Sequence, residues 1–279
     1  ADILGSVIEK FVDPRINLSV EPVLDDNGEV KLPALENHTM GSIFEELIHK
    51  FNEENNEQAG EHFTPRHVVE LMADITFLPV VDKIKDGSYL VYDGACGTGG
   101  MLTIAEKRLQ ELAKENNKQI SINLYGQEIN PETYAITKAD MLLKGEGKQA
   151  DNIAYGSTLS NDKFSTTNFD FMLSNPPYGK SWKTDLNKLG GKEHITDPRF
   201  AVTHNNESDF KMIPRSSDGQ LLFLANKISK MKQNTELGSR IVEVHNGSSL
   251  FTGDAGQGES NLRRYIIAVS YTHLTLPTN

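Results

Sequence analysis

Residues 89–100 read YLVYDGACGTGG, and this stretch decides the fold. The apolar run at its start is typical of a short buried strand, and the glycines that follow allow a ligand to approach the backbone closely. Residues 101–114 then place apolar side chains at the spacing of one helix face. Strand, glycine loop and helix in this order form the unit that binds nucleotide-like cofactors.

The glycine loop is not of the dinucleotide type, because Leu102 stands where the third glycine of that fingerprint would fall. No Lys-Ser/Thr pair follows the glycines, which argues against a phosphate-binding P-loop. Asp93, at the tip of the strand, would repel a pyrophosphate but can hold a cationic amino group. The loop therefore favours S-adenosylmethionine over NAD or ATP.

A second strand is predicted over residues 121–127, and it ends at Glu128. A carboxylate in this place binds ribose hydroxyls in related folds, and Ile129 can pack on an adenine face. The alternative for Glu128 is an acid in a solvated loop.

The sequence Asn175-Pro176-Pro177-Tyr178 follows the apolar run 169–173, which predicts another buried strand. Two prolines keep the backbone extended and remove two N–H donors, so that an amide oxygen and carbonyls remain to accept hydrogen bonds. This set suits a planar group that carries an NH2, such as adenine or a carboxamide. The alternative is an ordinary proline-rich turn.

From about residue 89 to 246 strands and helices alternate, which predicts a parallel doubly wound sheet. Asp93, Glu128, Ser157 and Asn175 all fall at the ends of predicted strands, where such sheets bind ligands.

Together these motifs resemble the modification subunit of type I restriction-modification systems, an N6-adenine DNA methyltransferase family. The similarity covers residues from about 1 to 268 and includes 60–66, GEHFTPR, and 155–159, YGSTL. It implies a Rossmann-like α/β sheet that binds S-adenosylmethionine, with a small helical segment at the N-terminus. The catalytic residues that it implies are Asn175, Pro176, Pro177 and Tyr178. The implied cofactor-binding residues are Phe63, Thr64, Pro65, Asp93, Gly94, Ala95, Cys96, Gly97, Thr98, Gly99, Glu128, Ile129, Ser157, Thr158 and Leu159.

The chain departs from the family at two of these positions. Many relatives carry Pro where Gly94 stands, and an acid where Ser157 stands. The first change is expected to loosen the loop slightly. The second leaves open whether a carboxylate, or only a hydroxyl and the backbone, contacts the adenine of the cofactor.

Charge limits how such an enzyme could hold DNA. The net charge of −11 has the wrong sign for gripping a polyanion unaided. The family resemblance implies that a specificity subunit supplies most DNA contacts and that a restriction nuclease subunit can join. Lys180, Lys183, Lys188, Lys192 and Arg199 follow the target motif and could line the DNA side, although a solvated loop is the simpler interpretation of each.

The remaining composition sets further expectations. The single cysteine, Cys96, fits a reducing cytoplasm and has no activating neighbour in the sequence. We find no membrane span, and the histidines lack the spacing of a metal site.

We expect three segments along the chain. Residues 1–62 are interpreted as the remnant of an N-terminal helical domain, with an amphipathic helix over 42–51. Residues 63–268 form the catalytic domain, incomplete at its C-terminus, with a helix that Thr64 caps and with a loose, polar loop over 180–218. Residues 269–279 match a back-translated sequencing adapter and are expected not to be native.

Two other functions compete with DNA methylation. A protein N5-glutamine methyltransferase also uses Asn-Pro-Pro-Tyr, because a carboxamide NH2 poses the same chemical problem as adenine N6. The other alternative is an inactive scaffold that binds the cofactor and only assembles a complex.

Overall fold

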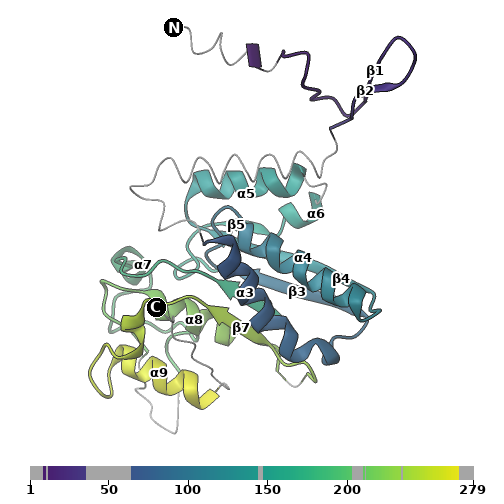
Figure 1. Ribbon diagram of the computed structural model, residues 1–279. Helices are drawn as coiled ribbons and strands as arrows, with labels where there is room; N and C mark the ends of the chain where they lie inside the picture. Colours follow the sequence, from purple (N-terminus) through teal and green to yellow (C-terminus); the bar gives the residue numbers. More distant parts are fainter. Residues whose placement is uncertain are drawn as a thin grey trace.

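The computed structural model describes residues 9–10, 12–35, 64–143, 147–202, 210, 212–233 and 235–269 (Figure 1). Its centre is a sheet of five strands: β3 (Gly87–Asp93), β4 (Ile120–Glu128), β5 (Ile153–Tyr155), β6 (Phe171–Ser174) and β7 (Arg240–Glu243). Their order is β5-β4-β3-β6-β7, and every neighbouring pair is parallel. This confirms the predicted Rossmann-like, doubly wound sheet.

Helices cover both faces of this sheet. They are α3 (Arg66–Phe77), α4 (Gly100–Glu115), α5 (Pro131–Leu143), α6 (Gly147–Ala150), α7 (Lys183–Lys188), α8 (Gln220–Ser229) and α9 (Gly258–Val269), with two 3-10 turns at Leu78–Lys83 and Gly247–Leu250. Figure 1 shows α3 and α4 side by side across the strands. None of the helices that the structure describes is long and apolar enough to cross a bilayer.

Alternation along the strands divides the core between the two faces. Val91 and Phe171 pack on one face, in the cluster that includes buried side chains of α3 and α4. On the other face Tyr92 stacks on Phe169, with ring centroids 4.5 Å apart. Because both faces are buried, the central strands are apolar almost throughout, as the sequence indicated.

The start of α3 differs in detail from the prediction. The cap is Pro65 rather than Thr64, and the Pro65 carbonyl accepts hydrogen bonds from the N–H groups of Val68 and Val69. Thr64 stands one residue before the cap, so its hydroxyl is free of the helix.

The segment after the target motif was expected to be a loose loop, and this expectation was wrong for its described part. Trp182 and Phe200 are buried there, together with Met212, against Leu221 and Leu222 of α8. These apolar residues are widely spaced and follow neither the helix nor the strand period, so the sequence pattern gave no signal for them.

The N-terminal segment is described only in part. Residues 12–35 contain a small antiparallel hairpin of β1 (Val23–Leu24) and β2 (Val30–Leu32). The helix predicted over 42–51 and residues 270–279 lie outside the described residues, and the expected domain boundaries stay predictions.

We predict that Phe171→Ala lowers the free energy of unfolding by about 3–5 kcal/mol, because Phe171 is fully buried and truncation leaves a cavity. Its ring meets Phe77 edge-on, with centroids 4.9 Å apart. Urea unfolding measures the loss. Phe251→Ala is the matched control, since Phe251 is 75% exposed and should change stability by less than about 0.5 kcal/mol. Equal effects of the two changes would contradict the assigned core.

Candidate cofactor and target-base site

The candidate site lies at the carboxyl ends of the parallel strands, where β3 and β6 separate. β3 pairs with β4 from Gly87 to Asp93, but it pairs with β6 only at Val91 and Tyr92. The strand order also reverses between β3 and β6. Doubly wound sheets bind their ligands at this kind of position.

The glycine loop between β3 and α4 adopts backbone angles that favour glycine. Gly97 and Gly99 have φ angles of 53° and 82°, in the left-handed region. A Cβ atom on Gly99 would lie 2.8 Å from Cγ2 of Thr137, so the loop has no room for a side chain there. The hydroxyl of Thr137 donates to the Gly97 carbonyl and holds the loop from α5.

Glu128 supports the same loop from the end of β4. One carboxylate oxygen accepts the N–H of Gly97 at 2.9 Å, and the other accepts the N–H of Asn130 at 2.7 Å. Glu128 is therefore not a solvated loop acid. Each oxygen keeps a further lone pair with which a hydroxyl could bond.

Asp93 is buried at the tip of β3 and joins the two diverging strands. One of its oxygens accepts the hydroxyl of Ser174 at 2.6 Å and the N–H of Ala95 at 2.9 Å. Burial raises the pKa of Asp93 to about 6, although these hydrogen bonds and the charge of Lys227 act in the opposite direction. The sequence analysis missed Ser174, whose position at the end of β6 was the available signal.

The loop after β5 carries the predicted residues Ser157, Thr158 and Leu159. The Ser157 hydroxyl accepts the N–H groups of Leu159 and Ser160, so it shapes its own loop. The Thr158 hydroxyl donates to the Gly94 carbonyl and ties the two predicted cofactor loops together. Leu159 packs into the cluster of Trp182 and Phe200, and its backbone N–H and carbonyl bond to the Ser157 hydroxyl and to Arg199.

The packing around position 94 explains why this chain has a glycine there. A Cβ atom there would lie 2.8 Å from the hydroxyl oxygen of Tyr92 and 3.2 Å from Cγ2 of Thr158. Tyr92 is fully buried and cannot swing out to solvent. The expected loosening is therefore offset by close packing around the glycine.

Asn175 has an unusual pair of environments. Its Nδ2 donates to the Thr64 hydroxyl at 3.0 Å, which fixes the orientation of the amide. Its Oδ1 is buried and accepts no hydrogen bond from any residue that the structure describes. Leaving a buried acceptor unpaired is unfavourable, by about 1–3 kcal/mol. An unpaired buried acceptor calls for an explanation, and a ligand that supplies the missing donor is one.

The remaining predicted residues differ in how far they are exposed. Pro176 is buried and Pro177 is exposed, while Tyr178 is 40% and Ile129 is 59% exposed, so both larger side chains are available to a ligand. Thr98 is half-buried in the glycine loop. Phe63 lies outside the described residues.

Both interpretations of Arg199, a residue of a solvated loop and a residue on the DNA side, were wrong. Its side chain is only 10% exposed and its guanidinium is surrounded by protein acceptors. The lysines grouped with it are exposed, and their role stays a prediction: Lys180, Lys183, Lys188 and Lys192.

Cys96 is placed as a small apolar residue of the glycine loop. It is buried, and burial raises the pKa of its thiol well above the usual value, so the thiolate is disfavoured. Within the described parts of the chain, no three His, Cys, Asp or Glu side chains gather as metal ligands would.

A comparison with protein families shows the family of this chain. The family described as N-6 DNA Methylase matches residues 35–279. The chain belongs to this family.

Individual relatives are restriction-modification proteins. The type I restriction enzyme MjaIX methylase subunit of Methanocaldococcus jannaschii is 27% identical over 228 residues, which are 81% of this chain and 35% of that protein. The MpnII methylase subunit of Mycoplasma pneumoniae is 30% identical over 185 residues, 62% of this chain and 32% of that protein. This N-6 DNA methylase chain thus spans about a third of the length of these relatives.

A solved structure is similar over most of the chain. It is the methyltransferase subunit of a type I restriction-modification system from Streptococcus thermophilus, with a TM-score of 0.64 and 27% identity. The match covers 88% of this N-6 DNA methylase chain and 45% of the other chain.

The raised pKa of Asp93 predicts how stability depends on pH. The Asp93 carboxyl keeps its proton up to about pH 6 in the folded protein, whereas it loses the proton near pH 4 in the unfolded chain. The contribution of Asp93 to the free energy of unfolding is therefore complete below about pH 4 and is lost as the pH rises through 6. We therefore expect Asp93→Asn to be more stable than the wild type above pH 6, by at most about 3 kcal/mol, and equal to it below about pH 4. Thermal unfolding across this range measures the difference.

The exposed Asp151 offers a matched control for this experiment. Asp151→Asn should run parallel to the wild type at every pH. If the melting temperature of Asp93→Asn also ran parallel to that of the wild type at every pH, this result would contradict a raised pKa of Asp93 in the folded state.

Proposed function

We propose that this chain carries the catalytic site of an S-adenosylmethionine-dependent DNA methyltransferase that modifies adenine N6. The observation that carries the proposal is the buried, unpaired Oδ1 of Asn175, held by Thr64 through the other end of the amide. This atom can accept one hydrogen of an exocyclic NH2. The Pro176 carbonyl follows directly in the chain and can accept the other.

The residues around the glycine loop fit S-adenosylmethionine. Gly97 and Gly99 let the ligand approach the backbone, Glu128 can bind the ribose hydroxyls, and Asp93 can hold the cationic amino group. When bound, the cofactor would supply an electrophilic methyl group: the S–CH3 bond would break as the N6–CH3 bond forms, the neutral thioether would leave, and one N6 proton would pass to solvent. The role of the protein is to place the reacting groups and to stabilise the transition state.

Asn175 and Pro176 make the target amine reactive. The N6 lone pair of adenine is delocalised into the ring, which makes it a poor nucleophile. Two acceptors that hold the N6 hydrogens out of the ring plane move the nitrogen toward tetrahedral geometry and localise the lone pair. Because Oδ1 is oriented in advance, little reorganisation is needed when the base arrives.

The base must leave the duplex to reach these acceptors, at a cost of a few kcal/mol. Tyr178 is 40% exposed, and its ring can stack on the flipped base. Stacking of this kind contributes about 1–3 kcal/mol and offsets much of the cost of flipping.

Partners are part of the proposal. With a net charge of −11, the chain needs a partner to bring most of the DNA contacts. We assign this task to a specificity subunit, as in a type I restriction-modification complex that a nuclease subunit can join. A reducing cytoplasm suits the single free cysteine and the DNA substrate.

The first test is methyl transfer by the chain assembled with its specificity subunit. Labelled S-adenosylmethionine is offered together with unmethylated DNA and a glutamine-containing peptide, and the products are digested. Label in N6-methyladenine supports the proposal, and label in the peptide replaces it with a glutamine methyltransferase. Cofactor binding without transfer to either substrate would favour the inactive scaffold.

Asn175→Ala should abolish methyl transfer while it leaves the Kd for S-adenosylmethionine nearly unchanged, since Asn175 acts on the target base. Single-turnover rates and calorimetric titration measure the two quantities. Transfer by this variant near the wild-type rate would refute the mechanism.

Thr64 should act through the orientation of Asn175. Thr64→Val removes the acceptor for Nδ2 while keeping the shape of the side chain, and we expect kcat to fall by about tenfold, the effect of one lost hydrogen bond. Thr64→Ser keeps the hydroxyl and should retain most activity. Equal losses in the two variants would show that the hydroxyl does not matter.

A further inference from the structure

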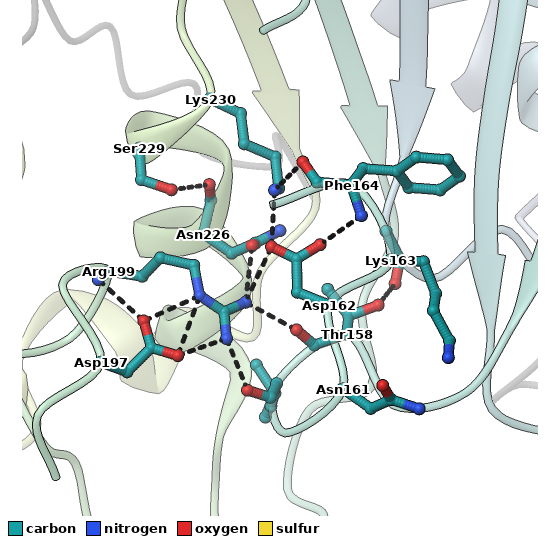
Figure 2. Close-up of polar contacts among 12 residues, drawn as sticks. Thr158, Asn161, Asp162, Lys163, Phe164, Asp197, Arg199, Asn226, Ser229 and Lys230 are labelled. Atoms are coloured by element: carbon teal, nitrogen blue, oxygen red, sulfur yellow. Dashed lines mark hydrogen bonds and ion pairs between the residues drawn. The ribbon is translucent and has the colours of Figure 1, made fainter. Parts of the chain in front are cut away.

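Arg199 is the centre of a buried polar cluster that Figure 2 shows in detail. Its guanidinium donates to two backbone carbonyls, of Thr158 at 2.7 Å and of Leu159 at 2.8 Å. It also donates to Oδ1 of Asn226 at 2.9 Å and to both oxygens of Asp197, at 3.0 and 2.6 Å. These contacts use all five N–H donors of the side chain, which is therefore fully satisfied.

The two carbonyls belong to the loop that follows β5. Thr158 continues the connection, because its hydroxyl donates to the Gly94 carbonyl in the glycine loop. A continuous path of hydrogen bonds therefore runs from Arg199 through Thr158 to the start of the glycine loop.

Arg199 itself comes from a different part of the chain, the segment that follows Asn175-Pro176-Pro177-Tyr178. A second contact joins the same two regions, since the Ser160 hydroxyl donates to Asp185 of α7 at 2.6 Å. Leu159 adds an apolar contact through the cluster of Trp182 and Phe200. The segment after the target motif thus forms the support of the loop after β5.

Charge and shape together favour arginine at position 199. Asp197 and Asp162 provide the opposite charge, with Asp162 3.4 Å from the guanidinium. A planar fork can pair with one carboxylate and still reach carbonyls on its other edges, whereas the compact ammonium of a lysine cannot.

We propose that Arg199 is a positioning residue that holds the loop after β5 in the geometry that binds the adenine end of S-adenosylmethionine. This inference rests on the proposed function, because it assumes that the cofactor lies beside Ser157 and Thr158. It also makes cofactor binding depend on the order of the segment that lies beside the target base.

The test is Arg199→Lys, which keeps the positive charge but loses the planar guanidinium with its several N–H donors. We expect the Kd for S-adenosylmethionine to rise about tenfold, the effect of losing charge-assisted hydrogen bonds to the loop. At saturating cofactor, kcat should stay within about threefold of the wild type, because the target acceptors are untouched. Calorimetric titration of the full chain and steady-state transfer in the assembled complex measure the two quantities.

Lys230→Met is the matched control from the same cluster. Lys230 is buried and donates to Asp162 and to the Phe164 carbonyl, without contacting Thr158 or Leu159 (Figure 2). This variant should lower the melting temperature, yet bind the cofactor with an unchanged Kd once titrated well below that temperature. An equal loss of affinity in both variants would reduce Arg199 to a general contributor to stability and overturn the proposal.

Two further measurements distinguish the possible outcomes of this test. If Arg199→Lys does not fold, Asp197→Asn replaces it as a milder change that weakens the hydrogen bonds holding the Arg199 guanidinium. The Kd for S-adenosylmethionine should then rise as well. An unchanged Kd in every folded variant would overturn the role of Arg199. Failure of the wild-type chain to bind S-adenosylmethionine would instead overturn the proposed function.

Discussion

The hydrogen bond from Ser174 to Asp93 spans the point at which the sheet divides. β3 and β6 pair at only two positions, Val91 with Phe171 and Tyr92 with Met172, and both strands then continue into the loops of the candidate site. A single contact of 2.6 Å reconnects the strands above the split. The glycine loop begins at one of its partners and the target motif at the other, so the two halves of the proposed reaction are set relative to each other by this bond.

Buried ion pairs lie near the candidate site, whose own charged side chains are Asp93 and Glu128. Lys227 and Glu243 pair at 3.0 Å with almost no exposure, and Lys230 pairs with Asp162 at 2.6 Å. Such pairs add little stability over apolar packing, because each charge must be removed from water. Their geometry is nevertheless specific, and they lie beneath the loops that must be placed accurately. We infer that these ion pairs keep the loops ordered, and that this order is what the protein gains for removing the charges from water.

Much of the site could be predicted from the sequence because its signals are local. The strand before Asp93, the glycine loop and the prolines after Asn175 each constrain their own backbone, and strand ends in a parallel sheet meet at one edge. The support of the site could not be predicted in this way. Thr64 meets Asn175 across 111 positions of the chain, and Arg199 meets Thr158 across 41. A basic residue in a polar stretch resembles a surface residue until its long-range partners are known.

Position 94 shows how a residue of the glycine loop and a residue of β3 constrain each other. The hydroxyl of Tyr92 occupies the space that a Cβ atom at position 94 would need. A residue with a Cβ atom, proline included, therefore fits at position 94 of this chain only after the tyrosine has lost its hydroxyl or moved. A substitution of Gly94 therefore requires an accompanying change at Tyr92, whereas removal of the Tyr92 hydroxyl alone leaves room beside Gly94.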